Sequence, residues 1–150
     1  MYYNPTGGHI ALSPDGRYLV FVGVDSASGD RHLVVRALSS SVSLPLPGTE
    51  GALYPFWSTD SRYVGYFANG KLMKILATGG PAQMICEAAA GRGGTWNSDG
   101  VIVFAHVSQH PQQPFTLGWA RSAVSPIPNC PQQGNHGPAA YRSASCSPAT

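Results

Sequence analysis

One segment of the chain sets a pattern that recurs: Trp57-Ser58-Thr59-Asp60-Ser61-Arg62-Tyr63-Val64-Gly65-Tyr66. Two other stretches have the same pattern, Leu12 to Phe21 and Trp96 to Phe104, the latter one residue shorter. Their aspartates recur after 45 and then 39 residues, which is the period of a four-stranded propeller blade. This internal repetition predicts a row of similar antiparallel meanders.

Each copy combines a strand end, a polar turn and the start of the next strand. An Asp in the turn can accept hydrogen bonds from backbone N–H groups just ahead of it, and Gly suits the last turn position. Ser61 replaces this Gly in the second copy, so we expect that turn to avoid a positive φ. The predicted turn residues, all structural, are Ser13, Asp15, Gly16, Ser58, Asp60, Ser61, Asn97, Asp99 and Gly100. The predicted repeat core residues are Leu12, Phe21, Trp57, Tyr66, Trp96 and Phe104.

Alternating apolar residues between turn signals predict ten strands. Their expected ranges are 8–12, 17–24, 31–37, 42–46, 53–57, 62–67, 71–76, 82–86, 94–96 and 101–105. Asn69-Gly70 between two apolar runs predicts a tight hairpin. No segment before residue 105 has helical periodicity.

These elements predict an all-β fold, a partial β-propeller with two four-stranded blades and the start of a third. Blade 1 is expected at about 7–51, blade 2 at about 52–92 and a partial blade 3 at about 93–105. Since propellers close a ring of four to eight blades, two and a half blades leave faces uncovered. We therefore expect a fragment whose partners are the remaining blades of a parent protein.

The last 45 residues, 106–150, differ from the rest. They contain seven prolines and no Asp, Glu or Lys, and no third strand of blade 3 is recognisable in them. A segment with so little apolar patterning is expected to be a disordered tail. A slip of the reading frame near residue 105 is the alternative explanation.

Charge and hydropathy exclude several classes of partner. The net charge of +2 is too small to indicate nucleic acid, and the arginines are scattered. The longest apolar run, Tyr18 to Val24, is far shorter than the ~20 residues that span a bilayer. The residues at the N-terminus lack the pattern of a signal peptide, so any export signal of a parent protein is expected outside this chain.

Residues that could carry chemistry have simpler structural explanations. The aromatic residues Phe56, Trp57, Tyr66, Trp96 and Phe104 could stack a ligand, but their recurrence favours packing between blades. The turn aspartates could form a ring of catalytic or metal-binding carboxylates, but their shared turn position favours capping. We expect no catalytic residue, no metal ligand and no cofactor.

Three further features could each have a chemical role or a purely structural one. His106 and His110 have the spacing of zinc ligands on a helix, which Pro111 makes improbable. The glycine cluster at 91–94 could hold a phosphate, but it precedes a short strand and is expected to be a propeller loop. Cys86, Cys130 and Cys146 are too widely spaced to indicate a disulfide framework, and Cys86 is expected to be buried.

The repeated segments resemble the WD40-like propeller repeat of the TolB type, also called PD40, with its aromatic-Ser-Pro-Asp-Gly-x-x-Ile-x-Phe pattern. The match covers roughly residues 7–105. Leu replaces the aromatic residue at 12, and Thr59 and Ser61 replace Pro and Gly. The resemblance implies a non-catalytic module that binds a protein or ligand, or acts as a scaffold, in a bacterial parent protein that is extracytoplasmic or periplasmic.

A closer resemblance is to the propeller regions that follow the kinase domain of some bacterial serine/threonine protein kinases. It lies in Leu46 to Ala52, in Tyr54 to Trp57 and in Gly91 to Asn97. It implies a sensory propeller of a receptor-like kinase as one alternative function. Because the same repeat occurs in prolyl-oligopeptidase-like peptidases and in TolB, a peptidase gate and a TolB-like periplasmic protein are the others.

Overall fold

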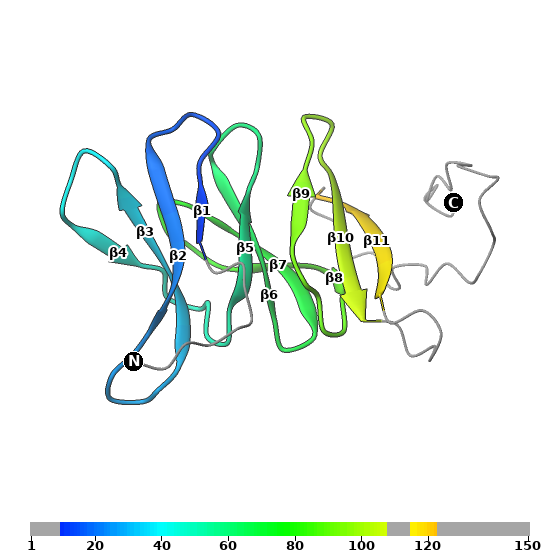
Figure 1. Cartoon of the computed structure of the whole chain (residues 1–150), viewed down its shortest axis with the longest axis horizontal. Coiled ribbons are helices and arrows are strands. Elements are labelled where there is room, and N and C mark those ends of the chain that lie inside the picture. The colour runs from blue at the N-terminus through cyan, green and yellow to red at the C-terminus, as the bar shows by residue number, and fades with distance from the viewer. Residues whose placement is uncertain (1–9, 108–114, 123–150) are drawn as a thin grey trace.

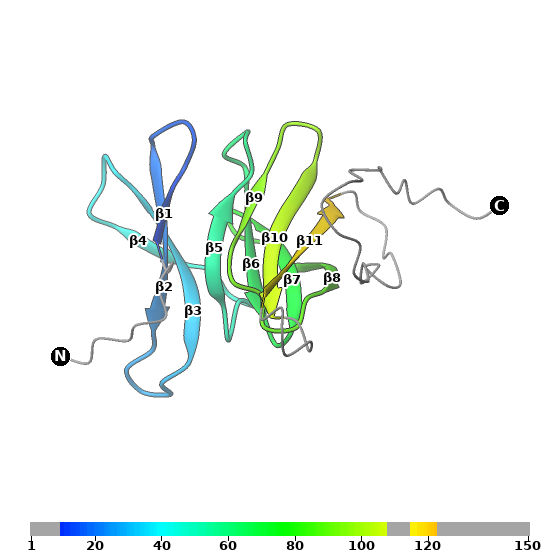
Figure 2. The same cartoon turned by 45° about the vertical axis from the view of Figure 1, so that its right-hand side comes forward.

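A computed structural model describes residues 10–107 and 115–122 of the chain. These residues form eleven strands in three antiparallel sheets, and no helix. The sheets stand next to one another in chain order, as Figures 1 and 2 show from two directions. Their first strands contact in series, β1 with β5 and β5 with β9. This arrangement of successive meanders is the predicted partial β-propeller.

The first sheet is a simple meander, β1-β2-β3-β4. It consists of β1 (Ile10–Leu12), β2 (Tyr18–Val24), β3 (Arg31–Ala37) and β4 (Ser43–Pro45). The loop between β2 and β3 is closed by its own hydrogen bonds. The Asp25 carboxylate accepts from the N–H groups of Ala27 and Ser28 at 2.7 and 3.0 Å, and the Asp25 N–H donates to the Asp30 carbonyl.

The second sheet has the same order, β5-β6-β7-β8. It consists of β5 (Leu53–Trp57), β6 (Tyr63–Ala68), β7 (Lys71–Leu76) and β8 (Gln83–Glu87). Here the β6–β7 connection is the predicted hairpin at Asn69 and Gly70, whose φ angles of 51° and 74° are those of a tight two-residue turn. All eight strands of the first two blades are therefore found where the sequence predicts them, within about two residues.

The third sheet corrects one expectation. It consists of β9 (Gly94–Trp96), β10 (Val101–Val107) and β11 (Phe115–Arg121) in the order β11-β10-β9. The expected tail began at residue 106, but β10 continues to Val107 and β11 pairs with it over seven residues. The strand at 115–121 was missed because Pro111 and Pro114 stand just before it, although Phe115, Leu117 and Trp119 alternate along it. The other residues of the expected tail, 108–114 and 123–150, lie outside the described part of the chain.

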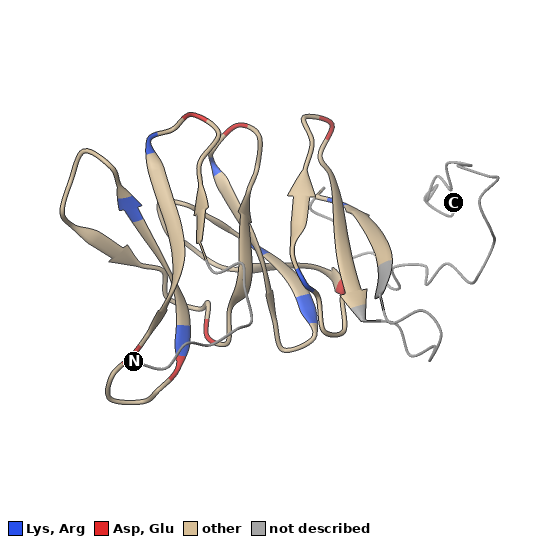
Figure 3. Cartoon of the chain, in the orientation of Figure 1, with Lys and Arg blue, Asp and Glu red and all other residues tan. Residues whose placement is uncertain are grey.

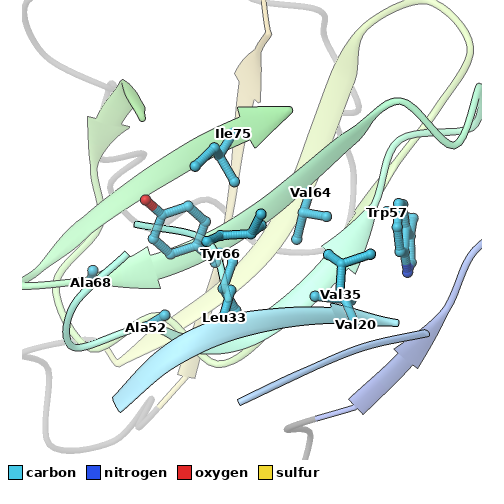
Figure 4. Packing of buried hydrophobic residues seen from close by; sticks show 10 residues of the cluster. Val20, Leu33, Val35, Ala52, Trp57, Val64, Tyr66, Ala68 and Ile75 are labelled. Carbon is cyan, nitrogen blue, oxygen red and sulfur yellow. The ribbon is translucent and has the colours of Figure 1, made fainter. Parts of the chain in front are cut away.

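An apolar layer joins the first two sheets (Figure 4). Val20, Leu33 and Val35 of blade 1 pack against Trp57, Val64 and Tyr66 of blade 2, and all six are buried. A second layer joins blades 2 and 3 in the same way. Its buried residues are Phe56, Phe67, Leu72, Ile85, Cys86, Ala88, Trp96, Ile102, Phe104 and Ala120.

A buried hydroxyl helps to hold the link from blade 1 to blade 2 in place. Thr49 is fully buried, and its hydroxyl donates to the Leu46 carbonyl at 2.6 Å and accepts from the Leu33 N–H at 2.9 Å. Leu46 and Ala52 on either side are buried in the first apolar layer. The segment between β4 and β5 is thus part of the core, although it has no regular structure.

Among residues 10–107 and 115–122, four residues other than glycine have a positive φ, and two of them are Ser61 and Ala90. Ser61 has a φ of 58°, so the expectation that its turn avoids this conformation was wrong. The turn keeps the backbone of the Gly-containing copies despite a cost of about 1–2 kcal/mol for a side chain there. Ala90, in the loop before β9, has a φ of 49° and is exposed.

We predict that Ala90→Gly stabilises the protein by about 1 kcal/mol, because Gly adopts a positive φ without steric cost. The measurement is urea unfolding followed by tryptophan fluorescence. The matched control is Ala27→Gly in an exposed turn without a positive φ, which should destabilise by about 0.5–1 kcal/mol. Equal effects of the two substitutions would contradict the assignment of strain to residue 90.

Candidate functional site

The three repeat turns lie along one rim of the molecule. They connect β1 to β2, β5 to β6 and β9 to β10, and in Figure 3 each carries an acidic residue at the upper edge. In the first two turns an arginine follows, Arg17 and Arg62. The turns of the sequence repeat are therefore exposed to solvent along this rim.

The first two turns have the same hydrogen bonds. Ser13 donates its hydroxyl to the Asp15 carboxylate at 2.5 Å, and this carboxylate accepts from the Arg17 N–H at 3.0 Å. The Ser13 hydroxyl oxygen also accepts from the N–H that opens β2, at 2.9 Å. Ser58 and Asp60 repeat these contacts in blade 2 at 2.5, 3.1 and 2.9 Å. Serine and aspartate therefore act together to close the turn.

The third turn is built differently. Asn97 stands at the serine position, and its side-chain oxygen accepts from the N–H groups of Asp99 and Val101 at 3.0 and 2.8 Å. The capping acceptor is thus Asn97, and the expectation that Asp99 caps like the other two aspartates was wrong. The Asn97 amide oxygen thus accepts two backbone N–H groups, whereas in the other two turns the serine and the aspartate each accept one.

The turn contacts lower the pKa of two carboxyl groups. The hydrogen bond from Ser13, and next the one from the Arg17 N–H, lowers the pKa of Asp15 below its ordinary value. For Asp60 the hydrogen bond from Ser58 is the largest cause of the lowered pKa. Both groups are stabilised as carboxylates by donors of their own turn, which is the behaviour of a cap.

Neighbouring turns and strands are also linked between blades. The Asp15 N–H donates to the Ser61 hydroxyl at 3.1 Å, and the Trp57 indole N–H donates to the Ala11 carbonyl at 3.0 Å. The Trp57 ring lies 6.4 Å from the Tyr18 ring. Trp96 occupies the equivalent position in blade 3, and its ring centre lies 6.4 Å from that of Phe56 and 6.2 Å from that of Tyr63.

Most of the predicted core residues lie where the repeat placed them. Trp57, Tyr66, Trp96 and Phe104 are buried between blades, so their ring faces are used for packing. Leu12 is different: it holds the position of Trp57 but is exposed, and Phe21, at the position of Tyr66, is only half-buried. The cause is that the described chain has no blade in front of blade 1.

A shallow depression of about 520 Å³ opens on blade 1 beside the rim. It is lined by Gly16, Arg17, Tyr18, Ala37, Leu38 and Ser39. The Leu38 N–H donates to the Arg17 carbonyl at 2.9 Å, which fixes the two sides of the depression to each other. Sequence reasoning missed it, because residues 17 and 38 come together only through the β2–β3 pairing.

Sequence reasoning also missed the role of Lys74. It is buried between blades 2 and 3, where its ammonium donates to the Ser122 carbonyl at 2.6 Å and lies 5.3 Å from the centre of the Tyr63 ring. Burial lowers its pKa. The contact holds the end of β11 on blade 2, so Lys74 has a structural role in joining the third blade.

Within residues 10–107 and 115–122, no group of three or more His, Cys, Asp and Glu side chains is placed to hold a metal ion. Within the same ranges no helix has the length and hydropathy needed to cross a membrane. Cys86 is buried, as expected.

We predict that Asp60→Asn makes stability depend less on pH. A lowered carboxyl pKa stabilises the fold above the unfolded pKa, and this stabilisation is lost as the pH falls through the folded pKa. Urea unfolding should show a loss of about 1 kcal/mol at pH 7, modest because the turn is exposed, and a shallower decline toward pH 2. The matched control is Asp99→Asn, because Asn97 is the acceptor in that turn. An equal change in the control would contradict the assignment.

No protein-family model and no curated protein matches the chain. Among solved structures it is similar to a putative TolB from Agrobacterium tumefaciens, with 18% identity and a TM-score of 0.57 over 72% of this chain and 43% of that one. TolB from Acinetobacter baumannii is 12% identical, with a TM-score of 0.60 over 75% of this chain and 29% of that one. An oligogalacturonate lyase from Vibrio parahaemolyticus is 20% identical, with a TM-score of 0.56 over 79% of this chain and 39% of that one.

The chain spans less than half the length of each of these proteins. At such identities the similarity concerns the fold. Together with the three stacked meanders, it shows that the chain has the fold of a partial β-propeller of the kind found in TolB.

Proposed function

We propose that the chain is a non-catalytic propeller module that binds a protein or small ligand. The observation that carries this proposal is the depression on blade 1. Its volume of about 520 Å³ lies within the usual range of ligand sites. Any catalytic domain of the parent protein would lie outside this chain.

The lining of the depression suggests the chemistry of the ligand. Arg17 offers a planar cation that suits a carboxylate, while the partly exposed Tyr18 ring and the exposed Leu38 offer apolar contact. A peptide or small molecule with a carboxylate next to an apolar group would use all three. Such a ligand fits the role of a binding module.

Hydrogen bonds and packing hold these three residues in place. Arg17 follows a turn closed by the Ser13 and Asp15 contacts, and Tyr18 begins β2 and packs on Trp57. Leu38 follows β3 directly and is bonded to the Arg17 backbone. A site on strand ends with fixed backbone loses little entropy when a ligand binds.

Three parent proteins are compatible with this module. A TolB-like protein is favoured by the two TolB structures among the similar folds. A peptidase gate and the sensory region of a receptor-like kinase rest on the resemblance of the repeat. The coding sequence on both sides separates them: a kinase domain with one membrane helix upstream, a Gly-x-Ser-x-Gly motif downstream, or a signal peptide with neither.

We predict that an N-acetylated Leu-Glu dipeptide shifts the backbone amide signals of Arg17, Tyr18 and Leu38 in a ¹⁵N NMR titration. Arg17→Gln should weaken this binding about 3–10-fold, because a charge-assisted hydrogen bond is lost at a solvent-exposed site. The matched control is Arg62→Gln, at the same repeat position in blade 2, which should leave the affinity unchanged. Shifts scattered over all blades, or equal weakening in the control, would contradict the proposed site.

A further inference from the structure

The first strand of blade 2 contains a β-bulge. Leu53 pairs with Phe67 and Phe56 pairs with Gly65, so two residues of β5 oppose one residue of β6. One of these two residues is Tyr54, whose φ is 50°. A side chain costs free energy in this left-handed conformation, and such strain is often kept at functional sites.

Blade 3 has the same bulge, but with a glycine. Arg92 holds the place of Leu53, and its N–H donates to the Ala105 carbonyl at 2.8 Å, while the Ala105 N–H donates to the Gly93 carbonyl at 3.2 Å. Gly93 stands 39 residues after Tyr54, the spacing of the two repeat tryptophans, and has a φ of 107°. Because a glycine satisfies this backbone without strain, the tyrosine in blade 2 is not required by the bulge, which indicates a role for its side chain.

The Tyr54 side chain connects the two bulges. Its ring is half-buried and packs against the apolar layer between blades 2 and 3. Its hydroxyl accepts a hydrogen bond from Nη1 of Arg92 at 3.4 Å. The contact is long, so it orients the guanidinium without using up its capacity to donate.

The glycine cluster at 91–94 explains how Arg92 is placed. A Cβ atom on Gly91 would lie 2.0 Å from the Phe67 ring, and one on Gly94 would lie 3.0 Å from the Phe56 ring. These two glycines therefore let the loop lie directly on two aromatic rings of blade 2. Arg92 is the exposed charged side chain that this closely packed loop presents.

The charge of Arg92 is not balanced by a neighbour. Within residues 10–107 and 115–122, no carboxylate forms an ion pair with it. Lys71, at the same edge of the sheets, stands opposite Glu87 on the neighbouring strand. An exposed guanidinium that is held in place and lacks a carboxylate is suited to an oxyanion.

We propose that Arg92 and Tyr54 form a binding site for an oxyanion, a carboxylate or a phosphate, carried next to an aromatic group. Arg92 donates to the anion. Tyr54 is the positioning residue: its hydroxyl orients the guanidinium, and its ring supports the aromatic group of the ligand. β5 and β9 both begin at the edge opposite the rim of repeat turns, so this site is separate from the depression on blade 1 (Figure 1).

The test is a ¹⁵N NMR titration of the full chain with phenyl phosphate and, separately, with phenylacetate. We expect a saturable shift of the Arg92 Nε–H signal and of the Gly93 amide with at least one probe, and the tighter probe identifies the oxyanion. Arg92→Gln should weaken this binding about 3–10-fold, followed at Gly93, because a charge-assisted hydrogen bond is lost at an exposed site. Arg92→Lys should lose less, since it keeps the charge but not the planar fork.

Tyr54 is tested with two variants. Tyr54→Phe keeps the ring and should weaken binding about 2–5-fold through the lost hydroxyl contact. Tyr54→Gly reproduces the backbone of blade 3, so the protein should stay folded, with dispersed amide signals, while most of the binding is lost.

The matched control is Lys71→Gln at the same edge, and Arg17→Gln is the control for the depression on blade 1. Both should leave the affinity for the probes unchanged. Arg92 and Gly93 signals that neither probe moves, equal weakening by Lys71→Gln, or unaltered binding in Tyr54→Phe and Tyr54→Gly would overturn the proposal.

Discussion

The structure depends on one interaction, the packing of each blade on the blade before it. A single meander has an apolar residue on both sides at almost every strand, so neither side can face water without a large cost. Trp57 and Trp96 make this contact at equivalent places, and the Trp57 indole adds a hydrogen bond to Ala11. The order of the blades, the burial of the link at Thr49 and the position of Lys74 all follow from it.

Much of the fold could be predicted from the sequence, because the information is local and repeated. Each turn sits between two short apolar runs, and three copies at spacings of 45 and 39 residues predict a row of similar meanders. The details that failed depend on geometry that the repeat does not specify. Ser61 adopts a positive φ because its turn keeps the shape of the Gly copies, and β11 forms by pairing with β10 although two prolines stand shortly before it.

The candidate site was harder to predict. Arg17 and Leu38 are 21 positions apart in the chain, and only the pairing of β2 with β3 brings them to the same depression. Likewise the capping role of Asn97 depends on an amide oxygen that accepts two backbone N–H groups of the turn. The conspicuous residues, the repeated tryptophans and aspartates, are used by the scaffold. Arg17 and Tyr18 recur in blade 2 as Arg62 and Tyr63, so the repeat does not mark them as ligand residues, and a repeat pattern predicts architecture better than function.

The loop between β2 and β3 illustrates where such an array tolerates change. Asp25 to Asp30 satisfies its backbone through its own carboxylate and carbonyl, whereas the same connection in blade 2 is the two-residue Asn69-Gly70 turn. Two blades of one chain therefore accept connections of different length at this corner without altering the strands they join. This corner is a natural point for grafting a foreign peptide or epitope, since the inserted segment would be carried by a frame that does not rely on it.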